Sequence, residues 1–163
     1  MPTQCRKNLL QLGEFRMKFL EENLVELDVE VSSADEAIRA AGKLLVEGGV
    51  VEESYVEAMV QSYHANGPYF VLAPRIALPH ARPEDGVNEA SVSFVRLASP
   101  VVFGNATNDP VNLVFALGAS SSDAHLEILQ KLMTLLSSQE NVKKLMEIRS
   151  YSEIKQLLGG NQS

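Results

Sequence analysis

Cysteine is nearly absent from this sequence: Cys5 is the only one among 163 residues. A single thiol cannot form an internal disulfide bond, and it cannot supply the ligands of a zinc–thiolate site. A chain without internal disulfides is typical of a reducing compartment. We therefore expect a cytoplasmic protein whose fold depends on its hydrophobic core.

Long hydrophobic runs and a surplus of basic residues are also missing. No apolar stretch approaches the length of a membrane span. The first twenty residues are interrupted by Gln11, Gly13, Glu14 and Arg16, unlike the apolar segment of a signal peptide. The net charge of −7 and the pI near 5.0 oppose binding to nucleic acid or anionic membranes. We expect no direct membrane insertion, and a protein partner with a basic surface fits better.

Several motifs of common enzymes do not occur. There is no glycine-rich phosphate loop of the Walker type, so a nucleotide is an unsuitable phosphate source. No HExxH pairing or compact His/Asp cluster supplies the three protein ligands of a metal hydrolase. We therefore expect neither a metal ion nor a cofactor.

The length and composition suit one globular domain. Hydrophobic residues make up 45% and charged residues 21% of the chain, which allows one sizeable core. We predict an N-terminal extension of unclear role at residues 1–20, a single domain at 21–158 and a frayed tail at 159–163. Flanking sequence at both ends favours a free-standing protein.

Two helices are predicted in the first half of the domain. Ser33 and Glu36 have the spacing of a capping box before an apolar-periodic run, and Gly48–Gly49 ends that helix. The segment 51–67 predicts a second helix, which stops at Asn66–Gly67.

The centre of the chain is strand-like and its end is helical. Apolar segments at 69–73, 76–80, 91–98 and 111–120 follow an earlier short strand at 26–31. Residues 120–138 predict a strong amphipathic helix, and shorter helices follow. Its buried stripe is expected to contain Leu126, Leu129, Leu132, Met133 and Leu136. Several strand connections are too short for a helical crossover, so we predict an α/β fold with a mixed sheet of about five strands and helices on both faces.

His80 is the first candidate for chemistry. It follows Pro79 at the end of a strand-like segment, and Pro83 lies three residues later. Two prolines around His80, Ala81 and Arg82 stiffen a loop that presents an imidazole and a guanidinium together. A rigidly presented imidazole suits a nucleophile, because its entropy is lost before the transition state. The alternative is a polar residue at a strand end that is satisfied by water.

His125 is the second candidate. It lies in the first turn of the helix predicted after strand 111–120, where free N–H groups can bind an anion. If segment 76–80 runs parallel to that strand, His80 and His125 meet at one edge of the sheet. A neutral imidazole could then attack phosphorus, with Arg82 and His125 stabilising the charge. From the residues alone, unconnected surface histidines stay equally open. For His64, near a helix C-terminus, an interaction with the helix dipole is the simpler role.

The order of several short segments resembles a known family. The Ala-Leu-Pro-His segment at 77–80 matches a phosphorylated-histidine motif, and His-Leu-Glu-Ile-Leu at 125–129 matches a segment with a second active-site histidine. From 24 to 158 the chain resembles the IIA components of the bacterial phosphoenolpyruvate-dependent sugar phosphotransferase system, in the fructose–mannitol class. The strings at 67–71, 79–84 and 108–111 are most similar to the L-ascorbate-type branch.

The resemblance implies a phosphoryl carrier. His80 would receive phosphate from the phosphocarrier protein HPr and pass it to a cysteine of the IIB component, with the membrane IIC component involved indirectly. Mannitol-type members carry an arginine sixteen residues before the phosphorylated histidine, and His64 occupies that position here. We expect Arg82 to take over the cationic role, with assistance from His64.

Two other functions are compatible with the same residues. A regulatory phosphoprotein of the nitrogen-type IIA kind would also use a phosphorylated His80, and its phosphorylation would control partner binding. A non-catalytic interaction module would leave His80 unmodified. The motif does not separate the first of these from sugar transport.

Overall fold

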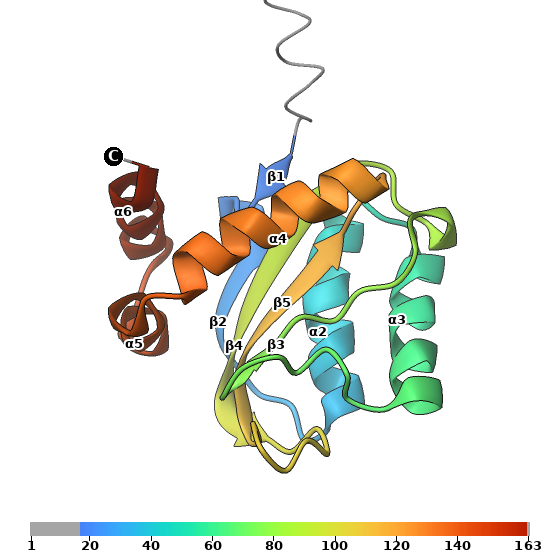
Figure 1. Ribbon diagram of the computed structural model, residues 1–163, viewed down its shortest axis with the longest axis horizontal. Coiled ribbons are helices and arrows are strands. Elements are labelled where there is room, and N and C mark those ends of the chain that lie inside the picture. Colours follow the sequence, from blue (N-terminus) through green and yellow to red (C-terminus); the bar gives the residue numbers. More distant parts are fainter. Residues whose placement is uncertain (1–16, 163) are drawn as a thin grey trace, which may run out of the picture.

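The computed structural model describes residues 17–162 (Figure 1). Within this range no helix combines the length and the apolar character that crossing a membrane requires. The elements, in chain order, are β1 (Lys18–Phe19), η1 (Glu22–Leu24), β2 (Val25–Val29), α2 (Ala34–Glu47), α3 (Glu53–Asn66), β3 (Ile76–Ala77), η2 (Pro83–Asp85), β4 (Ser91–Val101), β5 (Val111–Gly118), α4 (Ser122–Leu136), α5 (Gln139–Glu147) and α6 (Tyr151–Gln162).

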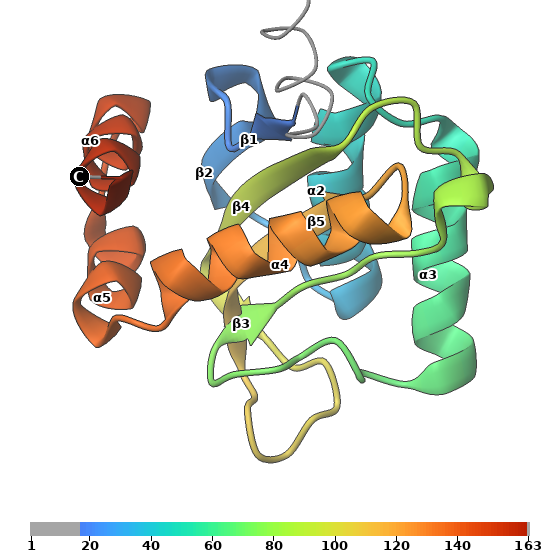
Figure 2. The same ribbon diagram turned by 45° about the horizontal axis from the view of Figure 1, so that its top comes forward.

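The five strands form one mixed sheet (Figure 2). β4 and β5 pair antiparallel at its centre, β3 lies parallel to β5, and β1 and β2 both lie parallel to β4. α2 and α3 cover one face, and α4, α5 and α6 cover the other (Figure 1). The α/β fold class predicted from the sequence is confirmed.

The two central strands divide the core into two layers. Alternate side chains of a strand point to opposite faces, so Val95 and Val114 pack with α2 and α3. Phe94 and Phe115 pack on the other face, where their rings stack with centroids 4.7 Å apart. Because both faces are covered, β5 is apolar almost throughout, as the run at 111–118 indicated.

The two helices predicted in the first half are confirmed, although the second begins at Glu53 and not at residue 51. The Ser33 hydroxyl accepts a hydrogen bond from the Glu36 N–H at 3.2 Å, and the Glu36 carboxylate accepts one from the Ser32 N–H at 2.8 Å. Gly49 and Gly67 follow the two helices with φ of +76° and +80°, a conformation that glycine adopts without steric cost.

The predicted strand at 69–73 is wrong. This segment is irregular, with one isolated bridge from Ala73 to Ile76. Phe70 and Val71 are buried in the core. This burial, and not pairing with a strand, accounts for the apolar character of the segment. The Val71 carbonyl accepts hydrogen bonds from the side-chain amides of Asn105 and Asn108, which replace a partner strand.

The predicted buried stripe of α4 is also partly wrong. Leu126 and Met133 are 59% and 56% exposed, whereas Leu132 is fully buried. The residues buried in this helix are Ala124, Ile128, Leu132 and Leu135. Leucine-rich positions repeat at helical spacing on two adjacent faces, so periodicity alone did not identify the face toward the sheet.

The ends of the domain differ from the predicted boundaries. β1 pairs with β4, and Leu20 is fully buried, so residues 18–20 belong to the sheet layer and not to an extension. At the other end α6 continues to Gln162. The rest of the predicted extension, residues 1–16, and the last residue of the predicted tail lie outside the described residues.

A buried arginine joins the sheet to the C-terminal helices. Arg96 of β4 is 7% exposed, and its Nη1 donates to the backbone oxygens of Leu145 and Ile148 at 3.2 and 2.5 Å. Its Nη2 donates to Asp28 at 3.0 Å. A cation at the C-terminal end of α5 satisfies carbonyls that the helix itself leaves unpaired and interacts favourably with its dipole.

Candidate active site

The sheet brings His80 and His125 together. β3 runs parallel to β5, and an isolated parallel bridge joins His80 to Leu117 at the end of β5. α4 starts a few residues after β5, so its first turn lies at the same edge. The two imidazole rings have centroids 5.4 Å apart and are inclined by 53°. The predicted meeting of these two histidines is confirmed.

The backbone fixes the tautomer of His80. Nδ1 lies 2.8 Å from the Leu78 carbonyl oxygen. A carbonyl oxygen can only accept a hydrogen bond, so Nδ1 carries the proton. In the neutral ring the lone pair is then on Nε2, which is the nitrogen available as a nucleophile.

His125 is held in the first turn of α4. The Ser121 hydroxyl caps this helix by accepting from the Ala124 N–H at 3.1 Å, and the His125 N–H donates to the Ser121 carbonyl. The pKa of His125 lies below 6.5, mainly because the ring is partly buried and to a smaller extent because of the charge of nearby His80. Its imidazole is therefore neutral near pH 7 and keeps one N–H to donate.

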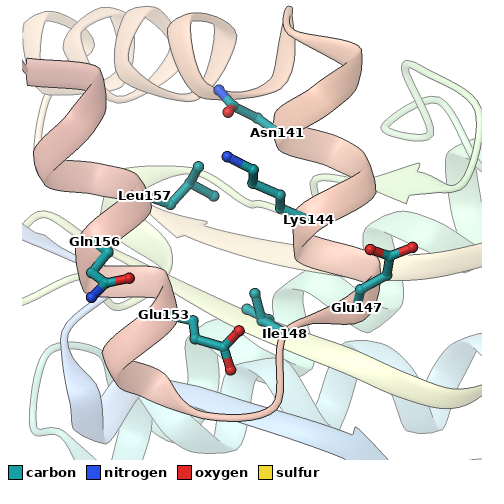
Figure 3. Close-up of a pocket in the computed structure, with 7 residues that line it drawn as sticks. All are labelled: Asn141, Lys144, Glu147, Ile148, Glu153, Gln156 and Leu157. Atoms are coloured by element: carbon teal, nitrogen blue, oxygen red, sulfur yellow. The ribbon is translucent and has the colours of Figure 1, made fainter.

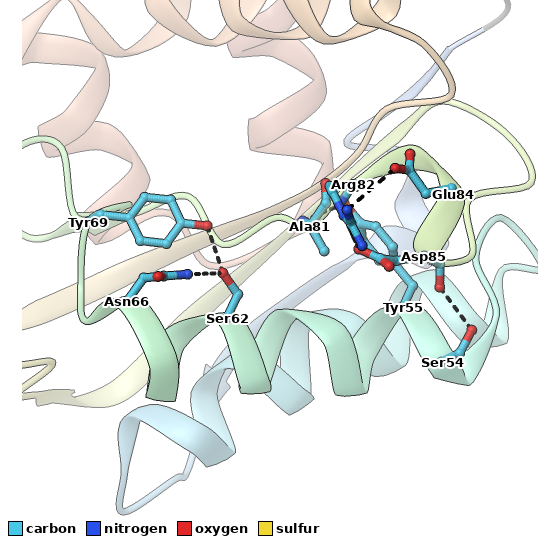
Figure 4. A network of polar contacts seen from close by, with 9 residues as sticks. All are labelled: Ser54, Tyr55, Ser62, Asn66, Tyr69, Ala81, Arg82, Glu84 and Asp85. Carbon is cyan, nitrogen blue, oxygen red and sulfur yellow. Dashed lines mark hydrogen bonds and ion pairs between the residues drawn. The ribbon is translucent and has the colours of Figure 1, made fainter.

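A groove of about 560 Å³ lies beside His80. Its wall is one side of α3, completed by the loop that carries the histidine. Tyr69 stands edge-on to the His80 ring at 5.7 Å between centroids, and its hydroxyl is 3.1 Å from Ser62 Oγ (Figure 4). The lining residues are Ala58, Gln61, Ser62, Ala65, Asn66, Tyr69, His80, Ala81, Arg82 and Asp85.

Arg82 lines the same groove but is engaged by carboxylates. Its side chain is 74% exposed, with Nη1 3.7 Å from Glu84 Oε2 and Nε 3.5 Å from Asp85 Oδ2 (Figure 4). Exposed ion pairs of this length are weak. The guanidinium can therefore exchange these partners for a stronger anion.

His64 faces a different partner. Its Nε2 lies 2.8 Å from Asp35 Oδ2 at the start of α2, and it is not among the groove-lining residues. The structure thus brings His80, His125 and Arg82 to one edge of the molecule and directs His64 toward α2.

Almost the whole described chain matches the model of a known family. Residues 18–160 match the model of the phosphoenolpyruvate-dependent sugar phosphotransferase system EIIA 2 family. The chain belongs to this family.

The relatives of this EIIA chain agree with that assignment. It is 33% identical to the ascorbate-specific PTS system EIIA component of Escherichia coli (strain K12) over 146 residues, which cover 89% of this chain and 95% of the relative. It is similar to enzyme IIA of the mannitol system in a complex with phosphorylated IIB from Escherichia coli, with a TM-score of 0.77, 31% identity and coverage of 87% and 99%. It is also similar to nitrogen regulatory protein IIA-Ntr from Neisseria meningitidis, with a TM-score of 0.69, 28% identity and coverage of 90% and 98%.

A second pocket in this EIIA domain has no residue that resembles the His80–His125 pair. It has a volume of about 610 Å³ and lies between α5 and α6, beyond the C-terminal end of α4 (Figures 1 and 3). Its lining consists of Asn141, Lys144, Glu147, Ile148, Glu153, Gln156 and Leu157, without a histidine. Among residues 17–162, no group of three or more histidine, cysteine, aspartate or glutamate side chains is arranged to hold a metal ion.

Proposed function

We propose that this chain is the phosphoryl-carrier subunit of a sugar phosphotransferase transport system. His80 accepts a phosphoryl group from phospho-HPr and passes it to a cysteine of a IIB component. The observation that carries the proposal is the contact of His80 Nδ1 with the Leu78 oxygen, which leaves Nε2 as the nucleophilic nitrogen beside the imidazole of His125.

The reaction needs no metal ion in this chain. The Nε2 lone pair of His80 attacks phosphorus, the new N–P bond forms, and the phosphohistidine nitrogen of HPr leaves with the electron pair of the broken bond. Positive charge that develops on the His80 ring is stabilised by the Nδ1–H bond to the Leu78 carbonyl. In the second transfer a cysteine thiolate of IIB attacks phosphorus, and His80 Nε2 takes back its electron pair.

The neighbouring side chains stabilise the transferred group. His125 is neutral, its ring centroid lies 5.4 Å from that of His80, and it donates its N–H to a phosphoryl oxygen. Arg82 releases Glu84 and Asp85 and neutralises phosphate charge from the groove. His64 would have to leave Asp35 before it could assist, so the proposal gives Arg82 the main cationic role.

The relatives favour transport over regulation. The curated relative compared above is an ascorbate-specific EIIA component, and the mannitol-system IIA complex shows that a similar protein binds its phosphorylated IIB. The similarity to a nitrogen regulatory IIA protein supports the second candidate, a phosphoprotein that controls partner binding. Both candidates require phosphorylated His80 and differ in whether a IIB cysteine accepts the group.

A phosphate-chase experiment tests the transport function. The chain is phosphorylated with labelled phosphoenolpyruvate, enzyme I and HPr, purified, and mixed with an ascorbate-type IIB protein or its active-site Cys→Ser variant. The proposal predicts transfer of label to the unmodified IIB protein only. Retention of all label on His80 with every sugar-system IIB offered would contradict transport and support the regulatory function.

A further inference from the structure

Tyr55 of α3 links the histidine loop to the end of β5. It is fully buried, and its hydroxyl lies 2.9 Å from the Ala81 nitrogen and 2.5 Å from the Leu117 oxygen. Figure 4 shows Tyr55 projecting from α3 toward Ala81 and Arg82. Nothing in the family motif or in the pattern of charges marked this residue.

The hydrogen of the Tyr55 hydroxyl has one good acceptor. The Ala81 N–H donates to the hydroxyl oxygen, and the hydroxyl donates to Leu117, since the Ala81 carbonyl is more distant at 3.3 Å. Burial raises the pKa of Tyr55 well above its ordinary value, so the hydroxyl stays protonated and keeps both roles at neutral pH.

Both peptide groups that flank His80 are connected to Leu117 of β5, one directly and one through Tyr55. On the N-terminal side, the Leu117 N–H donates to the Pro79 carbonyl at 3.0 Å. On the C-terminal side, Ala81 reaches the Leu117 carbonyl through the Tyr55 hydroxyl. The His80 ring itself bonds to Leu78. A loop without regular secondary structure is therefore restrained before, at and after the nucleophile.

We propose that Tyr55 is a positioning residue for phosphoryl transfer: its buried hydroxyl, between Ala81 and Leu117, holds the His80 backbone so that Nε2 points at the incoming phosphorus. The inference rests on the proposed function of His80. Tyr55 acts through the backbone and touches no reacting atom. Loss of its hydroxyl leaves the Ala81 N–H without its partner and lets the loop sample other orientations, which lowers the fraction of productive encounters.

The test compares Tyr55→Phe with Tyr63→Phe. Tyr63 is on the same helix, and its hydroxyl likewise donates to a backbone carbonyl, that of Phe103 at 2.6 Å, in a loop that does not carry His80. Both variants lose one hydroxyl that donates to a backbone carbonyl, and Tyr55→Phe also leaves the Ala81 N–H unpaired, so its loss of stability is expected to be the larger. We expect Tyr55→Phe to reduce the kcat of phosphorylation by phospho-HPr by about ten- to a hundredfold with KM nearly unchanged, and Tyr63→Phe to retain kcat within about twofold. Equal rates in the two variants, or a loss confined to KM, would overturn the proposal.

A second readout does not depend on phosphoryl transfer. ¹⁵N NMR of the His80 ring in both variants reports the Nδ1–H tautomer, and hydrogen exchange reports the Ala81 amide. The proposal predicts that Tyr55→Phe mixes the tautomers and speeds Ala81 exchange, whereas Tyr63→Phe changes neither. If the wild-type chain takes no phosphate, the proposed function fails, and this readout alone decides whether Tyr55 positions His80.

The wild-type protein provides a check should Tyr55→Phe fail to fold. Ala81 lies outside every helix and strand, so an amide held by Tyr55 should exchange far more slowly than that of an unbonded loop residue. Exchange of Ala81 at the rate of an unprotected loop amide would overturn the proposal, and strong protection would support it.

Discussion

The imidazole rings of His80 and His125 lie 5.4 Å apart between centroids, although one follows β3 and the other starts α4. The parallel pairing of β3 with β5 produces this contact, because β5 leads directly into the first turn of α4. The charge of His80 is the second cause, after burial, that lowers the pKa of His125. A change at His80 should therefore be detectable at His125.

The titration of His125 is the first prediction. Its pKa should lie below 6.5 in the free protein, because burial and then the charge of His80 disfavour its protonated form. In His80→Gln the pKa of His125 should rise, but stay below 6.5, because burial is the larger cause. NMR titration of the ring signals measures both values. A His125 pKa above 6.5 in the wild type, or one that His80→Gln leaves unchanged, would contradict the coupling.

The same group makes stability depend on pH. Since the pKa of His125 is lower in the folded chain than its ordinary value of 6.5, the unfolded chain binds more protons below that pH. The contribution of His125 is thus most favourable above about pH 6.5 and is lost as the pH falls toward the folded-state pKa. Urea unfolding between pH 5 and 8 should show a smaller decline for His125→Asn than for the wild type. If the free energy of unfolding depended on pH identically in the two proteins, His125 would not be desolvated in the folded chain.

Arg82 should matter for transfer and little for folding. Its side chain is mostly exposed, and its ion pairs with Glu84 and Asp85 are long, so Arg82→Ala should change thermal stability only slightly. Phosphorylation of His80 should slow more than about tenfold, because one cation beside the phosphoryl group is lost. Arg149→Ala, at an exposed position between α5 and α6, is the matched control. An Arg82→Ala rate equal to that of the control would remove Arg82 from the site.

Arg96, in contrast to Arg82, should matter for folding and little for phosphoryl transfer. Arg96→Met removes a buried donor to the Leu145 and Ile148 carbonyls and should lower the free energy of unfolding by about 2–4 kcal/mol. The pair with Asp28 contributes little to this loss, because Asp28 is 68% exposed. Denaturant unfolding measures the change, and the folded variant should still phosphorylate His80. A variant as stable as the wild type would show that the Arg96 hydrogen bonds only compensate for the cost of burying the guanidinium, without net stabilisation.

The parts of the fold that depend on local chemistry could be predicted from the sequence. Ser33 and Gly49 determine the ends of α2 through capping and backbone conformation, which act within a few residues. The segment at 69–73 could not be predicted in the same way. Its apolar character is shared by strands and by buried irregular chain, and the amides of Asn105 and Asn108 that satisfy Val71 come from a distant loop.

The candidate site shows the same division. The meeting of His80 and His125 followed from one assumption, that segment 76–80 runs parallel to strand 111–120, because parallel strands present their carboxyl ends at one edge of the sheet. Tyr55 and Tyr69 were not predictable, because their roles depend on the position of α3 and of the loop at 67–75 in space. His64 shows the converse: its position in the sequence suggested the phosphate site, whereas its contact with Asp35 is set by the packing of α3 against α2.

The most direct measurement is the intact mass of the chain after incubation with phosphoenolpyruvate, enzyme I and HPr, compared with that of His80→Ala. The proposed function predicts one acid-labile phosphoryl group on the wild type, attached through a nitrogen, and none on the variant. His125→Ala, which keeps His80, should still acquire the group, but more slowly. An unmodified wild type in the presence of fully charged HPr, or equal labelling of His80→Ala, would contradict His80 as the phosphoryl acceptor.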